Sequence, residues 1–133
     1  MKFLITSMVF LSFSAFAHNL KTGSYVEMQD KLASDDFQGA MKIQKQICEK
    51  ELDEKHKKEY QDCGKKFKDI KDIRESFKSL SEFYIKHGDT KEIDGLLVAY
   101  CPMAKAKWIQ KKGSIRNPYY GKSMLDCGGE VDK

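Results

Sequence analysis

Residues 67–88 read FKDIKDIRESFKSLSEFYIKHG and carry the longest regular pattern of the chain. Their apolar side chains recur at three- and four-residue steps, at Phe67, Ile70, Ile73, Phe77, Leu80 and Tyr84. Because an α-helix turns once every 3.6 residues, these positions share one face. His87 suits the negative end of a helix dipole, and Gly88 is the residue type that most often ends a helix, in left-handed backbone. The stretch predicts a long amphipathic helix that stops at residues 87–88.

Two shorter apolar stripes precede this helix. Tyr25, Met28 and Leu32 form the first stripe. Residues 34–36 supply N-cap candidates for the second, which contains Phe37, Ala40, Met41, Ile47 and Cys48. Residues 51–66 are almost wholly polar, and we expect them to extend one or both helices and to turn near residues 63–64.

Helices with one apolar side must bury that side against one another. The expected fold class is therefore all-α: a small antiparallel helical bundle with a loop-rich C-terminal tail that has room for a hairpin. Its predicted core contains Phe37, Met41, Ile47, Phe67, Ile70, Phe77, Leu80 and Tyr84.

The C-terminal third differs in composition from the helical part. Residues 95–100 read GLLVAY, a continuous apolar run that is too short for a bundle helix and indicates a buried extended segment. Sulfur, aromatic and turn-forming residues follow, in the stretches CPM at 101–103, NPYYG at 117–121 and MLDCG at 124–128. Such composition is typical of a loop-rich tail.

The first 17 residues have the pattern of a secretory signal. Lys2 precedes an apolar run that ends in Ala-Phe-Ala at residues 15–17, and the run is shorter than the roughly 20 residues that a membrane span needs. We expect residues 1–17 to be removed, leaving His18 first. The expected product is one periplasmic or secreted, soluble domain, residues 18–133, with a Cys/Met-bearing segment at about 96–128.

The charge pattern argues against a nucleic-acid binder. Lysine and arginine number 24 against 20 acidic residues, so losing Lys2 leaves 23 against 20, or +3. Opposite charges also alternate, as in KELDEKHKKE at residues 50–59, which is typical of a solvated helix face. No Gly-x-Ser-x-Gly, His-Glu-x-x-His, phosphate-binding glycine loop or Cys-x-x-Cys occurs, and we expect no enzyme.

The four cysteines are Cys48, Cys63, Cys101 and Cys127. An even number in an oxidising compartment is compatible with two disulfides in three connectivities. Of the single bridges, the sequence favours Cys48–Cys63, because both residues lie on neighbouring helices or at their connection.

The tail also contains two sulfur pairs that suit a metal site. In an extended strand Cys101 and Met103 would point to the same side, and Met124 and Cys127 would share a face if their segment is a helical turn. Thiolates and thioethers are soft ligands that favour Cu(I) or Ag(I). His87 is the nearest histidine in sequence and a weaker candidate ligand.

Other readings of these residues stay open. Cys101 and Cys127 can form a disulfide instead, and the methionines can be core residues. Trp108 can shield a bound cation with its ring. Separately, an N-terminal His18 offers an amine and an imidazole to Cu(II).

The stretch from Ile73 to the C-terminus resembles a bacterial periplasmic domain family of unknown function. The resemblance rests on residues 73–81 (IRESFKSLS), 100–104 (YCPMA), Trp108, 115–121 (IRNPYYG) and, after these, Met124 and residues 127–128 (CG). Members of that family stand alone or are appended to periplasmic adaptor subunits of copper and silver efflux systems. The resemblance implies a helical bundle, a Cys/Met-bearing tail and a link to heavy-metal handling, with efflux components as partners.

This chain departs from the family in one segment. Only residues 105–107 separate the Cys-Pro-Met-Ala stretch from Trp108, whereas family members usually carry a longer, glycine-containing segment. The competing function is a disulfide-stapled structural or interaction module without metal, in which Trp108, Tyr119 and Tyr120 form an aromatic surface.

Overall fold

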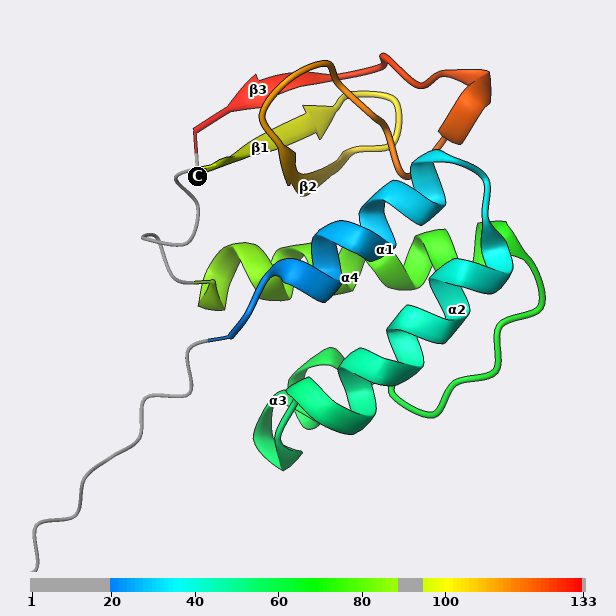
Figure 1. Ribbon diagram of the computed structural model, residues 1–133, viewed down its shortest axis with the longest axis vertical. Coiled ribbons are helices and arrows are strands. Elements are labelled where there is room, and N and C mark those ends of the chain that lie inside the picture. Colours follow the sequence, from blue (N-terminus) through cyan, green and yellow to red (C-terminus); the bar gives the residue numbers. More distant parts are fainter. Residues whose placement is uncertain (1–19, 89–94, 133) are drawn as a thin grey trace, which may run out of the picture.

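The computed structural model describes residues 20–88 and 95–132, in which helices pack beside a small sheet (Figure 1). The elements in chain order are α1 (Gly23–Ala33), α2 (Phe37–Gln46), the π-helical turn η1 (Ile47–Glu51), α3 (Glu54–Tyr60), α4 (Ile70–His87), β1 (Leu96–Cys101), β2 (Ala106–Lys111), the 3-10 turn η3 (Gly121–Ser123) and β3 (Gly129–Val131). The all-α prediction is therefore wrong, because most of the predicted tail belongs to a three-stranded antiparallel sheet or its connections. Within these residues, no helix is both long and apolar enough to cross a membrane.

Aspartates begin three of the helices. The carboxylates of Asp36, Asp53 and Asp69 each accept a hydrogen bond from the backbone N–H three residues later, at 2.8 or 2.9 Å. Such a cap satisfies a donor that has no partner inside the helix. Asp36 confirms the N-cap expected within residues 34–36.

Helix α4 ends where the sequence predicted, but for a different reason. Gly88 has φ −62° and ψ 140°, which is extended rather than left-handed backbone. A Cβ atom at this position would lie 2.6 Å from the carbonyl oxygen of Tyr84. A side chain here would therefore crowd the last turn of α4, which favours glycine.

The predicted core is confirmed for half of its members. Ile47, Phe77, Leu80 and Tyr84 are buried. Phe37, Met41, Phe67 and Ile70 are only partly buried and pack against the core from outside. These four lie toward the periphery: Phe37 and Ile70 are the first residues of α2 and α4, and Phe67 precedes α4.

The polar residues 51–66 do not simply extend the neighbouring helices. The chain leaves η1 at Leu52, forms the short helix α3, and turns at residues 62–65.

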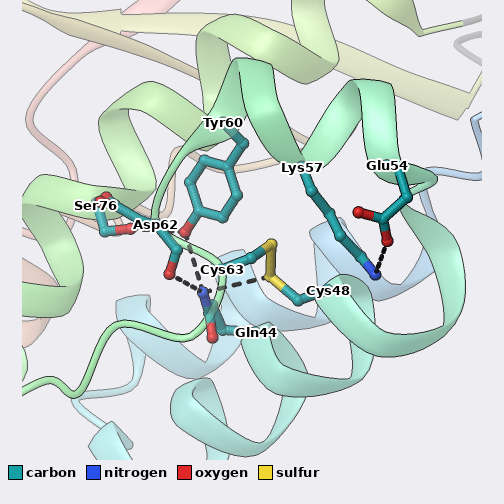
Figure 2. Close-up of a disulfide and its surroundings, with 8 residues drawn as sticks. All are labelled: Gln44, Cys48, Glu54, Lys57, Tyr60, Asp62, Cys63 and Ser76. Atoms are coloured by element: carbon teal, nitrogen blue, oxygen red, sulfur yellow. Dashed lines mark hydrogen bonds and ion pairs between the residues drawn. A yellow bond between two sulfur atoms is a disulfide. The ribbon is translucent and has the colours of Figure 1, made fainter.

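A disulfide joins Cys48 in η1 to Cys63 in this turn and so confirms the favoured pair. The Gln44 amide lies against the disulfide and donates to the Tyr60 hydroxyl (3.3 Å) and the Asp62 carbonyl (3.2 Å) (Figure 2). A bridge over 15 residues stabilises a fold by about 3 kcal/mol.

The apolar run at residues 95–100 forms β1, the central strand, which confirms the predicted extended segment. Residues 102–105 turn the chain into β2, with Lys105 in left-handed backbone at φ 52°. Strand β3 pairs with the other side of β1, giving the order β2-β1-β3. The tail therefore does contain the hairpin that the sequence allowed.

The sheet meets the helices through β2, which packs on α1 and α4 (Figure 1). Buried hydroxyls satisfy the outer edge of this strand. Tyr25 accepts from the Ile109 N–H (3.1 Å), Tyr119 donates to the Lys107 carbonyl, and Ser81 joins the two tyrosine hydroxyls at 2.7 and 3.1 Å. Burial raises the pKa of Tyr25 and Tyr119, which keeps both hydroxyls protonated. The edge strand is thus covered by the helical half of the molecule.

Candidate functional site

Two cysteines of the tail meet at one end of the sheet. Cys101 is the last residue of β1, and Cys127 lies two residues before β3. Because β3 pairs antiparallel with β1, with Tyr100 opposite Gly129, the chain brings Cys127 back beside Cys101. Their Sγ atoms lie 2.8 Å apart, and neither cysteine forms a disulfide. The structure thus places two thiols in contact.

The two thiols have different surroundings. Cys101 is fully buried, whereas Cys127 is partly exposed. Burial raises the pKa of the Cys101 thiol, but hydrogen bonds from the Cys127 thiol, the Ala104 N–H (3.4 Å) and the Asn117 side chain outweigh it and lower the pKa overall. The hydrogen bond to Cys101 raises the pKa of Cys127, and burial adds to this. Within the pair, Cys101 is therefore the thiol that loses its proton first.

The predicted methionine ligands flank the thiols along the chain. Met103 lies in the hairpin turn and is 62% exposed, so it is not a core residue. Met124 is partly buried, and its carbonyl accepts the Cys127 N–H at 3.1 Å. Met124 and Cys127 therefore belong to one turn.

The structure does not bring His87 to the thiols. Its Nε2 atom lies 2.8 Å from the Glu59 carboxylate, and its ring packs against Phe83 and lies 5.4 Å from the His56 ring. Hydrogen bonds from Lys86 and His87 lower the pKa of Glu59 to about 2. In Figure 1 the C-terminal end of α4 and the start of β1 lie on the same side of the molecule, and the arrowhead of β1 points away from that side. His87 belongs to the contact between α3 and α4.

The aromatic residues of the tail form core rather than surface. Trp108 is fully buried, lies edge-on to Tyr119 at 5.8 Å, and donates its Nε1–H to Gln110. A Cβ atom on Gly128 would lie 2.8 Å from the Trp108 ring, so the ring packs directly beside the residue after Cys127. Tyr119 is buried and Tyr120 partly buried, so the three rings do not form the exposed aromatic surface of the competing function.

Asn117 is a site residue that the sequence did not identify. It is fully buried. Its Oδ1 atom accepts the N–H groups of Tyr119 and Tyr120 at 2.8 and 3.0 Å, and its Nδ2 donates to the Cys127 carbonyl at 2.7 Å. The first two bonds form an Asx turn, for which Asn-Pro at residues 117–118 was a visible signal. The third bond links the NPYYG stretch to the dithiol.

The described residues contain no group of three or more His, Cys, Asp or Glu side chains that could hold a metal ion. A metal bound at the dithiol would therefore need ligands of another kind, such as thioethers, or a coordination number of two.

No protein-family profile, curated protein or solved structure matches the chain.

Proposed function

We propose that this protein binds one soft metal ion, Cu(I) or Ag(I), through Cys101 and Cys127, and acts in heavy-metal handling outside the cytoplasm. The observation that carries the proposal is the pair of unbonded thiols in contact at the end of β1. Thiolates favour soft ions strongly, and each gives up a proton on binding. The Ala104 N–H hydrogen-bonds to the Cys101 sulfur at 3.4 Å, as an outer partner of a thiolate ligand does. Met103 and Met124 are the nearest soft groups along the chain that can add ligands.

Metal entry requires a small movement of the sulfurs. An ion held by two thiolates at about 2.3 Å, the distance in zinc sites, separates the sulfurs by about 3.8 Å at a tetrahedral angle and about 4.6 Å in a linear arrangement. The sulfurs, now 2.8 Å apart, must therefore separate by about 1 to 2 Å. Cys127 is the partner that can move, because it is partly exposed and lies outside regular secondary structure.

The short distance also supports a second function, a disulfide-stapled structural module without metal. A disulfide requires about 2.05 Å between the sulfurs, which is closer to the observed 2.8 Å than the metal-bridged separation is. Joining Cys101 to Cys127 would fix the segment that leads into β3 against the end of β1. The two functions exclude each other at any one time, because a disulfide has no thiolate to offer.

Copper uptake by the reduced protein is the deciding test. We expect the reduced wild type to take one Cu(I) from a colorimetric chelator, and the oxidised protein to take none. Cys101→Ser should weaken uptake by at least about tenfold, and far more than Met103→Leu or Met124→Leu does. Reduction also opens the Cys48–Cys63 disulfide, so the Cys48→Ser/Cys63→Ser variant is the control for those two thiols and should retain uptake. No uptake by the reduced wild type, or equal uptake by Cys101→Ser, would leave the stapled module as the function.

Export is a further part of the proposal. The signal sequence and His18 lie outside the described residues, so their prediction rests on the sequence alone. We expect intact-mass measurement of the exported protein to give a chain that begins at His18. A mass that still includes residues 1–17 would contradict export by this route. The same preparation would show whether His18 binds Cu(II). It would also show which metal-efflux components stay bound to the protein as partners.

A further inference from the structure

Cys127 lies between a short strand and an irregular segment. Strand β3, which follows it, has three residues and, among the described residues, pairs only with β1. On the other side, the segment from η3 to Cys127 has no regular secondary structure. Two hydrogen bonds from Asn117 hold this segment: its backbone N–H donates to the Leu125 carbonyl (2.7 Å), and its Nδ2 donates to the Cys127 carbonyl (2.7 Å).

Asn117 holds the backbone of Cys127 through its side-chain amide. It is itself fully buried, so water cannot easily replace it at the Cys127 carbonyl. The hydrogen bond that holds Cys127 is therefore protected from solvent.

We propose that Asn117 is the positioning residue of the dithiol: its Nδ2 group holds Cys127 so that the two sulfurs meet. Asn117 thereby raises the effective concentration of one thiol at the other, which favours every reaction that needs both sulfurs. Those reactions are disulfide formation and, resting on the proposed function, metal chelation.

The two ends of the Asn117 side chain can be tested separately. Oδ1 shapes the NPYYG turn through Tyr119 and Tyr120, whereas Nδ2 holds Cys127. Asn117→Asp keeps the acceptor for the turn but places an oxygen opposite the Cys127 carbonyl, where two acceptors repel. Asn117→Ser keeps a short acceptor for the turn and loses the reach to Cys127. Gln44→Glu makes the same amide-to-acid change beside the other cysteine pair and is the matched control.

The experiment measures the disulfide equilibrium of each full-length exported protein in buffers of reduced and oxidised glutathione. Protein dithiol and one glutathione disulfide give the protein disulfide and two glutathione thiols, and alkylation with mass spectrometry counts the products. We expect Asn117→Asp and Asn117→Ser to lower the Cys101–Cys127 equilibrium constant by at least about tenfold, and Gln44→Glu to leave it unchanged. Circular dichroism checks that each variant is folded at the temperature used.

An unchanged constant in a folded Asn117→Asp or Asn117→Ser protein would overturn the positioning role, since a purely structural turn residue would not alter it. Cu(I) competition on the same reduced samples separates this result from the metal function. If no protein takes up Cu(I) but the constant still falls in the Asn117 variants, the metal function fails and the positioning role is supported.

Discussion

Replacing Phe77 with alanine is expected to lower the free energy of unfolding by about 3 to 5 kcal/mol, the range for a fully buried aromatic residue. The Phe77 ring stacks on Tyr25 at 4.9 Å and lies 6.0 Å from Tyr119. Ser81 holds the hydroxyls of both tyrosines, so these rings cannot easily shift into the space that Phe77 would leave. The cavity should therefore stay open, and its full destabilising effect should appear as a lower free energy of unfolding.

Urea unfolding followed by circular dichroism measures the loss. Phe67→Ala is the matched control, because Phe67 precedes α4 and is only partly buried. We expect the control to lose about 1 kcal/mol. A loss below about 1 kcal/mol for Phe77→Ala would show that Phe77 is not at the centre of the core.

The helical part of the fold was predictable because its signal is local and long. The stripe that includes Phe77, Leu80 and Tyr84 repeats over five turns and corresponds to α4. Strand β2 has a weaker signal. Its exposed residues, Lys107 and Lys111, share a strand face with the fully buried Ile109, so no two-residue period marks the strand. Gln110 looks like a surface residue in sequence but is buried, because the Trp108 ring N–H and the Arg116 N–H both donate to its side chain.

The remaining features depend on contacts between distant residues. Strand β3 has three residues, and it forms only because β1, about thirty residues earlier, offers a free edge. The sequence grouped Cys101 with Cys127 correctly by chemistry. It also grouped His87 with them because His87 is near in sequence, although β1 starts close to the end of α4 and runs away from it (Figure 1). Asn117 was seen as part of a motif, but its bond to Cys127 appears only once the tail is folded.

Arg74 links the helical half of the molecule to the tail. From α4, its Nε atom donates to the Pro118 carbonyl (2.8 Å) and its Nη2 atom to the Leu32 carbonyl (2.7 Å). Nη2 also pairs with Asp35 at 2.8 Å, and the Arg74 side chain is only 12% exposed. Gly121, at φ 59°, passes so close that a side chain there would collide with both members of this ion pair.

We expect Arg74→Ala to cost about 2 to 4 kcal/mol, because two backbone carbonyls lose a charged donor in a place with little water. The tail should loosen more than the helices, since α1 and α4 keep their apolar contacts. Hydrogen exchange at residues 117–127 should therefore rise more than exchange within α4.

The matched control is Arg116→Ala: Arg116 also pairs with an aspartate, Asp30, at 3.0 Å, but its side chain is 41% exposed. Exposed pairs contribute little, and we expect a loss below about 1 kcal/mol.

The pH dependence gives the Arg74 prediction a second measurement. The hydrogen bond from Arg74 is the largest of the influences that lower the pKa of Asp35 in the folded protein. A carboxyl whose pKa is lower in the folded state than in the unfolded state stabilises the fold above its unfolded pKa, and this stabilisation is lost as the pH falls through the lowered value. The stability difference between wild type and Arg74→Ala should therefore be full at neutral pH and smaller in acid. A difference that stays constant from neutral pH to pH 2, or Arg74→Ala and Arg116→Ala losing equal stability, would show that Arg74 does not clamp the tail through this ion pair.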